Sequence, residues 1–557
     1  MDVQLKSIKD YLEKNNYECV YVANSKRDFL FVDIYINNEV IRLKCVFPIG
    51  FPYEFPKIYI LKAFYKKYHQ LPHVDKEGLI CTFDTNKVFP NINKPEMVTL
   101  ECIKKAQNIL QDGINEENLD DFYEEISSYW LMESTIIGDL IFSPGDKVKK
   151  LFYYKKNNKI IFLSDNKKKL IDYIRYSKEL KINNSKIKEA IYIPLNSLWK
   201  PPFNITNREM FECLKEEKYY NEYVEYMRDN SSNRIVIFSQ KLNGSIFIGG
   251  WEHKKVKTPN GFRNNSIDPL YLYKIVYGNN AINKININQL GHKRLFERGG
   301  DGNIKENIKV SISGCGSIGS YLTKTLIDLG INKFHLIDND ILTSENIARH
   351  YCGASYMMQY KVDSMKKEIL KHYPDIECDI SKESIFEVIN NNLEIFNGSD
   401  LNFIAVGNIA IENKFISLFN NMEIRKPIIL LWVEPYLIGG HAIVLQKKQD
   451  ISSFFDYDFS FKNRVILNGE EYIKKESGCH STFLPYSAFE MQLFISNIID
   501  FINKKIIEKN DSGNYILSWC GRIDKARREY KGMKINSSWI SSNGRELKVS
   551  KLRNEEI

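Results

Sequence analysis

The chain has 557 residues, of which 43% are hydrophobic and 27% are charged, a composition typical of globular proteins. Intrinsic disorder is therefore excluded for most of its length. At roughly 100–200 residues per domain, the length predicts about three to five domains. The net charge of +8 is spread over the whole chain and is too dilute to indicate a nucleic-acid-binding protein.

The hydropathy pattern predicts neither a membrane segment nor a secretion signal. The most apolar stretch, residues 428–445, is interrupted by Glu434, Pro435 and His441, whereas a membrane helix needs about 20 apolar residues. The first residues contain no apolar core of the kind found in signal peptides. We therefore expect a cytoplasmic protein with no membrane partner and with free thiols. No two of its ten cysteines are spaced as Cys-x-x-Cys, so no zinc ribbon is expected.

Three regions differ in their secondary-structure pattern, and we predict an α/β and α+β multidomain protein. Residues 1–125 begin as a helix and continue with the strands FLFVDIYI and VIRLKCVF, a proline-rich loop and a helix near 97–110. Residues 126–285 predict an α+β middle domain with the strands KIIFLS, EAIYIPL, RIVIFSQ and SIFIGGW. Residues 286–557 alternate strand and helix, which predicts a parallel α/β sheet.

A glycine-rich loop follows the first strand of the last region. Gly314, Gly316 and Gly319 form a G-x-G-x-x-G pattern between a strand and a helix, the context in which this pattern binds phosphate. The first glycine permits the turn, the second admits a phosphate, and the third lets the helix pack on the strand. Asp338 ends the next strand, where it can accept hydrogen bonds from a ribose.

The polar residues that follow distinguish adenylation from hydride transfer. Asp340, Asn346, Arg349 and Lys361 come after Asp338, and an oxidoreductase has no need for this polar run beside a pyrophosphate. During adenylation a carboxylate attacks the α-phosphate, and negative charge builds on the phosphate oxygens. Arg349 and Lys361 could neutralise that charge, and Asn346 could donate a neutral hydrogen bond.

The series GCGSIG, DNDILTSENIARHY and Lys361 resembles the Rossmann-like adenylation domain of ubiquitin-activating enzymes and their ThiF relatives. The resemblance implies ATP as cofactor, with Asp338 and Asp340 near the ribose, Asn346 and Arg349 on phosphates and Lys361 on the adenylate. The family usually has an aspartate that helps to hold Mg²⁺. Gly407 stands at that position here. Two alternatives therefore stay open: Asn408, Glu412 or another acidic residue helps to hold the metal, or the phosphates carry it with water.

Thioester formation requires an accessible thiolate near the adenylate. Cys479 lies in the loop SGCHSTF before an apolar helix, where the resemblance implies a loop crossing over the nucleotide, and it is our first choice. Cys520, in ILSWCGRID, is the alternative, although a buried thiol also explains its sequence context. Cys315 and Cys213 are expected to be packing residues.

The amino-terminal region offers a second nucleophile. Cys81 lies in LPHVDKEGLICTFD, after the proline-rich segment and before a helix. This order resembles ubiquitin-conjugating enzymes over about residues 1–115, which implies that Cys81 carries an acyl group. His73 stands where that family has the asparagine of His-Pro-Asn. Two roles remain open for it: a hydrogen-bond donor to the oxyanion, or a residue that only orders the loop.

Both domains in one chain resemble the bacterial fusions of conjugating and activating enzymes encoded in CBASS anti-phage operons. The resemblance implies ATP-dependent activation of the C-terminus of a cGAS/DncV-like nucleotidyltransferase, a relay through Cys479 and Cys81, and transfer to a lysine or other amine of an acceptor protein. It also implies a homodimer, in which Arg294 or Arg298 could reach the partner's nucleotide. A nucleotide-dependent oxidoreductase, a sulfur-carrier adenylyltransferase and a binding module with inert cysteines remain the alternatives.

Overall fold

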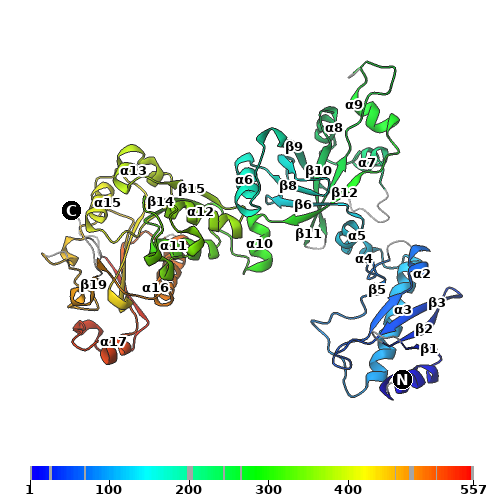
Figure 1. The fold of residues 1–557 in the computed structure, drawn as a ribbon, viewed down its shortest axis with the longest axis horizontal. Helices are drawn as coiled ribbons and strands as arrows, with labels where there is room; N and C mark the ends of the chain where they lie inside the picture. Colours follow the sequence, from blue (N-terminus) through cyan, green and yellow to red (C-terminus); the bar gives the residue numbers. More distant parts are fainter. Residues whose placement is uncertain are drawn as a thin grey trace. The chain divides into compact units, whose positions relative to one another are not determined.

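The computed structural model describes residues 3–23, 28–67, 71–196, 205–242, 245–263, 266–457, 460–475, 482–509 and 511–552. The chain divides into two compact units (Figure 1). The first unit comprises Met1–Leu140, Pro144–Asn166 and Asn183–Gln289, and the second comprises Ile141–Ser143, Lys167–Ile182 and Leu290–Ile557.

The first unit begins with a five-stranded antiparallel sheet in the order β1-β2-β3-β4-β5. Its strands are β1 (Glu18–Val22), β2 (Phe29–Ile36), β3 (Glu39–Val46), β4 (Lys57–Ile60) and β5 (Leu79–Ile80), and its helices are α1 (Val3–Lys14), α2 (Lys62–Lys67) and α3 (Pro95–Asn115). Side chains of β2, β3, α1 and α3 form one apolar core. The predicted strands and the long helix are confirmed, and the proline-rich segment joins β3 to β4.

Two short helices, α4 (Leu119–Glu124) and α5 (Ile126–Glu133), lead from α3 to a second sheet. This sheet is a closed barrel in the order β10-β11-β12-β6-β8-β7-β9. Its strands are β6 (Ile136–Ile141), β7 (Lys149–Lys155), β8 (Ile160–Ser164), β9 (Lys188–Leu195), β10 (Arg234–Leu242), β11 (Ser245–His253) and β12 (Asn283–Gln289), and its helices are α7 (Asn207–Cys213), α8 (Tyr220–Arg228) and α9 (Pro269–Tyr271). The four predicted strands are confirmed.

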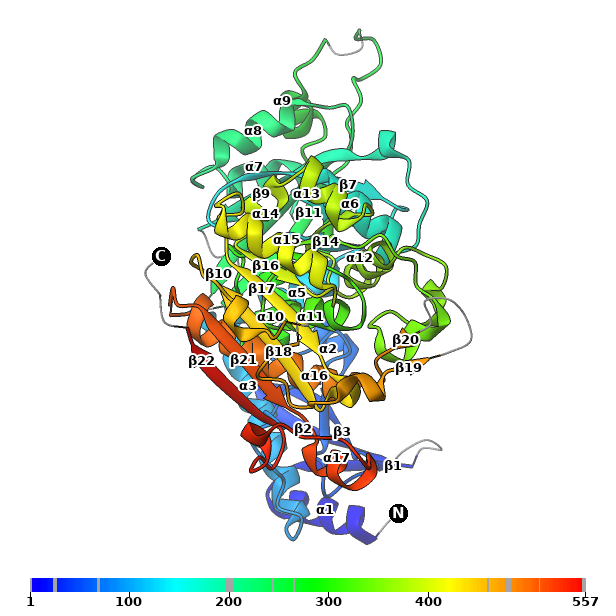
Figure 2. The same cartoon turned by 90° about the vertical axis from the view of Figure 1, so that its left-hand side faces the viewer.

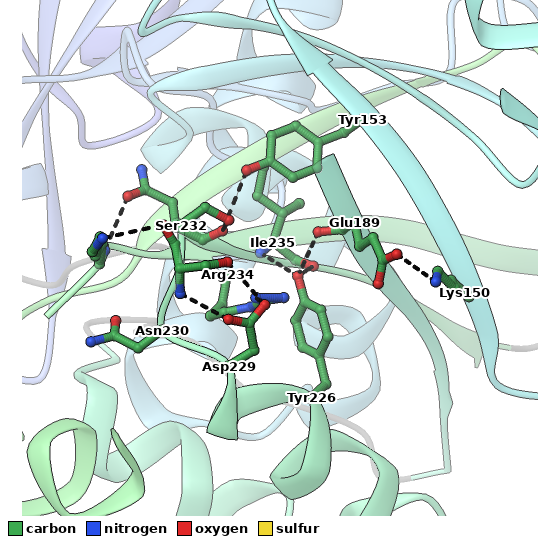
Figure 3. A network of polar contacts seen from close by, with 12 residues as sticks. Lys150, Tyr153, Glu189, Tyr226, Asp229, Asn230, Ser232, Arg234 and Ile235 are labelled. Carbon is green, nitrogen blue, oxygen red and sulfur yellow. Dashed lines mark hydrogen bonds and ion pairs between the residues drawn. The ribbon is translucent and has the colours of Figure 1, made fainter. Parts of the chain in front are cut away.

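An ion pair between a buried arginine and an exposed aspartate lies where α8 meets the barrel (Figure 3). Arg234 on β10 is only 2% exposed. Its guanidinium binds Asp229 at 2.5 Å and lies 4.1 Å from the ring centroid of Tyr226. The Tyr226 hydroxyl accepts a hydrogen bond from the Ile235 amide at 3.0 Å and donates to the Glu189 carbonyl at 3.1 Å. These contacts join α8 to both β9 and β10, so the network stabilises the packing of α8 on the barrel.

The second unit contains an eight-stranded sheet in the order β15-β14-β13-β16-β17-β18-β21-β22. Figure 2 shows β16, β17, β18, β21 and β22 as neighbouring ribbons. Its strands are β13 (Lys309–Ser313), β14 (Lys333–Ile337), β15 (Glu377–Ser381), β16 (Leu401–Ile404), β17 (Ile428–Val433), β18 (Gly439–Leu445), β21 (Tyr515–Cys520) and β22 (Glu546–Lys551), with β19 (Lys474–Lys475) and β20 (Thr482–Phe483) forming a separate pair.

The prediction of a parallel sheet holds only for the first five strands, from β15 to β17. β18, β21 and β22 are antiparallel. The reason is local: Tyr436 and Leu437, between β17 and β18, both adopt a positive φ, and this tight turn returns the chain directly beside β17. A parallel partner would have required a longer crossover.

Helices cover both faces of this sheet. Successive side chains of β17 point to opposite faces: Ile429 and Leu431 pack in one core, while Ile428 and Leu430 pack in the other. The helices of the second unit are α6 (Lys167–Asp172), α10 (His292–Gly299), α11 (Ser317–Asp328), α12 (Lys361–His372), α13 (Ile385–Asn391), α14 (Glu394–Asn397), α15 (Ile409–Asn420), α16 (Ala488–Ile502) and α17 (Ile523–Glu529). None of the helices in the described ranges has both the length and the apolar composition needed to cross a membrane.

Candidate functional site

The glycine loop joins β13 to the open N-terminus of α11. Gly314 has a φ of 90°, and a Cβ there would lie 2.7 Å from the Ala405 carbonyl oxygen. A Cβ on Gly319 would overlap the Gly314 carbonyl oxygen, whereas a Cβ on Gly316 would meet nothing within 4 Å. Two glycines are therefore required by the fold, while Gly316 leaves space for a ligand at the helix N-terminus.

Asp338 and His350 hold this loop from two sides. The Asp338 carboxylate accepts hydrogen bonds from the Cys315 amide at 2.7 Å and the Asp340 amide at 2.8 Å, and burial raises its pKa. His350 Nδ1 accepts from the Cys352 amide, so its Nε2 donates to the Cys315 carbonyl at 2.8 Å. Burial lowers the pKa of His350 to about 4. A neutral His350 therefore orders the loop.

The polar residues predicted from the sequence differ in their hydrogen-bond partners near the loop. Arg349 donates to the Leu484 carbonyl at 2.8 Å, and its guanidinium lies 5.0 Å from the Tyr486 ring centroid. The Ser317 hydroxyl donates to the Arg349 carbonyl at 2.7 Å. The Asn346 amide oxygen accepts from the Thr343 amide, and its Nδ2 has no acceptor within the described part of the chain. The structure thus brings Arg349 to the N-terminal end of α11.

Lys361 begins α12 with its side chain 10% exposed and pairs with Asp340 at 2.7 Å. The Asp340 side chain is 65% exposed. Because this carboxylate faces water, solvent can replace the ammonium as its partner, which leaves Lys361 available to a phosphate. Lys361 and Asp338 are not among the residues that line the cavity described next.

A cavity of about 930 Å³ opens beside the N-terminus of α11. Gly316, Ser317 and Arg349 line it beside the helix. Its other walls come from β17, α15, the segments 450–457 and 482–486 and Phe461, and they combine apolar side chains with the carboxylates of three acidic residues: Ile416, Leu430, Trp432, Phe455, Phe461, Phe483 and Tyr486, with Glu412, Asp450 and Asp456. A cavity lined by apolar side chains and a small number of polar groups is typical of a binding site.

Glu412 is the carboxylate in this chamber whose environment stands out. It lies in the first turn of α15, its Oε1 is buried, and no described group donates a hydrogen bond to that oxygen. Burial raises the pKa of Glu412 to about 7. Gly407 and Asn408 are poorer candidates for a metal ligand. Gly407 has no side chain, and the Asn408 side-chain oxygen accepts hydrogen bonds from the amides of Ala410 and Ile411. An unpartnered oxygen donor in a phosphate-accessible cavity fits Mg²⁺ chemistry, which uses one or two carboxylates plus phosphates.

The raised pKa of Glu412 predicts a pH-dependent stability of the ligand-free protein. Because the pKa is raised in the folded state, the folded state binds the proton more tightly, and stability is lost as pH rises from about 4.5 to about 7. We expect Glu412→Gln to stabilise the protein at pH 8 by about 1–3 kcal/mol, or a Tm increase of a few degrees. At pH 5 we expect little change. Thermal unfolding at both pH values tests this, and an equal shift at the two would contradict it.

The cysteines separate clearly by exposure. Cys315 and Cys520 are buried, and burial raises the pKa of Cys520 to about 11, so both are poor nucleophiles in this state. Cys479 lies outside the described residues. Cys213, which we expected to pack, is exposed at the end of the short helix α7. The burial of Cys520 favours Cys479 between the two sequence-based choices.

Cys81 is exposed just after β5. Its amide donates to the His73 carbonyl at 2.8 Å. Burial of the thiol together with the charges of Glu125 and Asp75 raises the pKa of Cys81. Glu125 and Asp121, which contact His73, had no signal in the sequence beyond their acidity, because the segment 121–125 lies about 50 residues further along the chain.

Two families match the two ends of the chain. Residues 289–443 match the ThiF family, and residues 10–136 match Prokaryotic E2 family B. The chain is thus an E2-like domain joined to a ThiF-like domain, and the predicted fold class and family resemblance are confirmed.

The chain is similar to two proteins named ATP-dependent ubiquitin transferase-like protein Cap2. The protein from Pseudomonas aeruginosa is 20% identical over 58% of this chain and 61% of its own length. The protein from Escherichia coli is 20% identical over 78% of this chain and 80% of its own length. A solved structure of E. coli MccB with AMPCPP and MccA is 18% identical, covers 41% of this chain and 63% of that chain, and has a TM-score of 0.26. The match to the Pseudomonas protein therefore spans about three fifths of that relative.

Proposed function

We propose that this chain activates the C-terminal carboxylate of a protein with ATP and transfers the resulting acyl group to an amine of an acceptor. The observation that carries the proposal is the cavity at the N-terminus of α11, with Arg349 in its wall, in the same chain as the exposed Cys81. The similarity to proteins named as ubiquitin transferase-like supports the same conclusion.

In the first step, the substrate carboxylate attacks the α-phosphate of ATP, and pyrophosphate leaves. The glycine loop and the N-terminus of α11 bind phosphate through backbone amides, and Asp338 and Asp340 lie on the ribose side. Arg349, Lys361 and the Nδ2 of Asn346 offset the negative charge that builds in the transition state. Glu412 is the residue that would hold Mg²⁺, which would supply positive charge to offset that of the phosphates.

In the second step, Cys479 takes the acyl group as a thioester and releases AMP. Cys81 then receives it by transthioesterification and transfers it to a lysine or another amine. Each transfer keeps the acyl group activated. We assign these steps to the domain at 286–557 and the domain at 1–125, joined by the middle domain at 126–285.

The substrate in this proposal is the C-terminus of a cGAS/DncV-like nucleotidyltransferase, and the enzyme acts as a homodimer. Arg294 and Arg298 are both exposed on α10, which leaves them available to a partner subunit. The apolar walls of the cavity suit a C-terminal segment with apolar side chains.

Pyrophosphate exchange tests the adenylation step. We expect Arg349→Ala and Lys361→Ala to slow ATP–pyrophosphate exchange by about 100- to 1000-fold, because each removes a positive charge from the developing phosphate charge. Arg349→Lys is the matched control for the first variant, and it should restore only part of the rate because lysine lacks the planar fork. Unchanged exchange in both alanine variants would contradict the roles of these residues.

The same assay distinguishes two of the alternatives, and the requirement for Cys81 distinguishes the third. An oxidoreductase would oxidise or reduce a nicotinamide cofactor and would not exchange pyrophosphate. A binding module would bind ATP without exchange. A sulfur-carrier adenylyltransferase would exchange pyrophosphate but would have no need for Cys81 in the final transfer.

A further inference from the structure

The cavity beside α11 continues along the whole length of α15. Ile409, Asn413, Ile416 and Asn420 follow one another at helical spacing in the wall that α15 contributes. At the far end, Asn420 exchanges two hydrogen bonds with the backbone of Gln449, each 3.1 Å long. Because a helix rises about 1.5 Å per residue, the first and last residues of α15 lie about 16 Å apart. This span equals about five residues of an extended peptide.

The two ends of the cavity differ in charge. Arg349 lies near the N-terminus of α11 and is the only lysine or arginine among the described residues that line the cavity. Asp450 follows Gln449 at the far end, Asp456 belongs to the same segment, and the negative end of the α15 dipole points toward them. Glu412 is nearer to α11, but burial raises its pKa to about 7, which removes much of its charge near neutral pH. A complementary ligand is therefore anionic at one end and cationic at the other.

Asp450 is the carboxylate at the far end that is available to a ligand. Its side chain is exposed and accepts a hydrogen bond from the Ser452 amide at 2.8 Å. This hydrogen bond lowers the pKa of Asp450, so the carboxylate stays charged. Within the described ranges no cationic side chain forms an ion pair with it, whereas Asp456 pairs with Arg464 at 3.1 Å.

Three aromatic rings line the cavity together with these carboxylates. The ring centroids of Trp432 and Phe461 lie 5.1 Å apart, and Phe455 lies 5.5 Å from Phe461 and 6.4 Å from Trp432. Phe455 belongs to the same segment as Asp450 and Asp456. An arginine side chain can place its alkyl stem and its guanidinium plane on aromatic rings while it pairs with a carboxylate.

We propose that the far end of the cavity binds a basic side chain, preferably arginine, roughly four to six residues before the C-terminus of the protein substrate, and that Asp450 pairs with it. This inference rests on the proposed function, which places the C-terminal carboxylate of the substrate near Arg349. From there an extended chain reaches the far end of α15 after about five residues. Asp450 takes no part in adenylation and determines which C-terminal segments bind.

The test measures the binding of synthetic peptides to the full chain without ATP, so that the result does not depend on adenylation. The probes are acetylated peptides of about eight residues, built from alanine and serine with a C-terminal glycine, in which one arginine occupies each internal position in turn. A matched set carries citrulline, which keeps the shape of arginine without its charge. Calorimetry at low ionic strength should show that arginine binds about tenfold more tightly than citrulline, but only about four to six residues before the C-terminus.

Three variants assign this preference to Asp450. Asp450→Asn keeps an acceptor for the Ser452 amide and should lose most of the preference for arginine. Asp450→Lys should reverse the preference, so that a peptide with glutamate at the same position binds more tightly than the arginine peptide. Glu394→Lys makes the same change of charge at an exposed position of α14 that does not line the cavity, and it should keep the wild-type preference.

Equal affinity of the arginine and citrulline peptides at every position would overturn the inference, as would an arginine preference that survives in Asp450→Lys. Pyrophosphate exchange with the same peptides tests the proposed function separately. Exchange without any preference for arginine would contradict the inference alone. An arginine preference in binding, with no exchange for any peptide at saturating concentration, would contradict the proposed function and leave the binding site in place.

Discussion

Replacing Cys81 with alanine is expected to abolish conjugate formation, by at least about a thousandfold, while ATP–pyrophosphate exchange continues at the wild-type rate. The reason is chemical: no other side chain at this position can hold the acyl group as a thioester. We assign adenylation to the ThiF-like domain, whose glycine loop and Arg349 do not depend on the thiol. Conjugates are measured as reductant-resistant mass increases of the acceptor protein after incubation with ATP.

Cys213→Ala is the matched control, because Cys213 is also exposed but lies at the end of α7 in the middle region. It should form conjugates at the wild-type rate. Conjugates formed at a normal rate by Cys81→Ala would show that the acyl group reaches the amine from another residue, and the relay would then end at the ThiF-like domain.

Two matched substitutions in the glycine loop are expected to have the second large effect, one on stability and the other on ATP affinity. Gly319→Ala places a methyl group against the Gly314 carbonyl, so the loop or α11 must shift. We expect a loss of about 3 kcal/mol or more in stability, a Tm decrease of roughly 6–12 °C, and loss of ATP binding. Gly316→Ala meets no atom within 4 Å. Its stability should therefore stay within about 0.5 kcal/mol of wild type, while ATP affinity falls about 10- to 100-fold because the methyl group obstructs the phosphate.

Thermal unfolding and calorimetric ATP titration of the two variants separate the two effects. If Gly316→Ala binds ATP as tightly as wild type, the phosphate does not approach α11 at this point. If Gly319→Ala is as stable as wild type, the close packing of α11 on β13 does not limit the fold.

Much of the candidate site could be predicted from sequence because its residues are close together in the chain. The loop 314–319, Asp338 and Arg349 are separated by one helix, one strand and a short turn, and the strand–turn–helix context fixes where they lie. The structure adds how they act: Asp338 accepts from the loop amide of Cys315, and His350 orders the loop as a neutral ring. Neither arrangement has a signature in residue spacing.

Contacts between distant segments were not predictable in the same way. Glu125 contacts His73 across 52 positions, and the cavity wall combines β17 with segments near 455 and 483. The barrel closes through parallel pairing of β6 with β12, about 150 residues apart. Local periodicity predicts strands but not their partners. The antiparallel half of the large sheet was likewise decided by the positive φ of Tyr436 and Leu437, which no sequence pattern marked.

The most direct test of the relay is the intact mass of the full chain, purified from its native host with ATP and divided into samples with and without reductant. We predict a protein-sized adduct that reductant removes from wild type, and that is retained on Cys479 in the Cys81→Ala variant. The mass of the adduct would identify the activated protein. No adduct in wild type or in Cys81→Ala would contradict the thioester relay and leave nucleotide binding or adenylation alone as the activity of this chain.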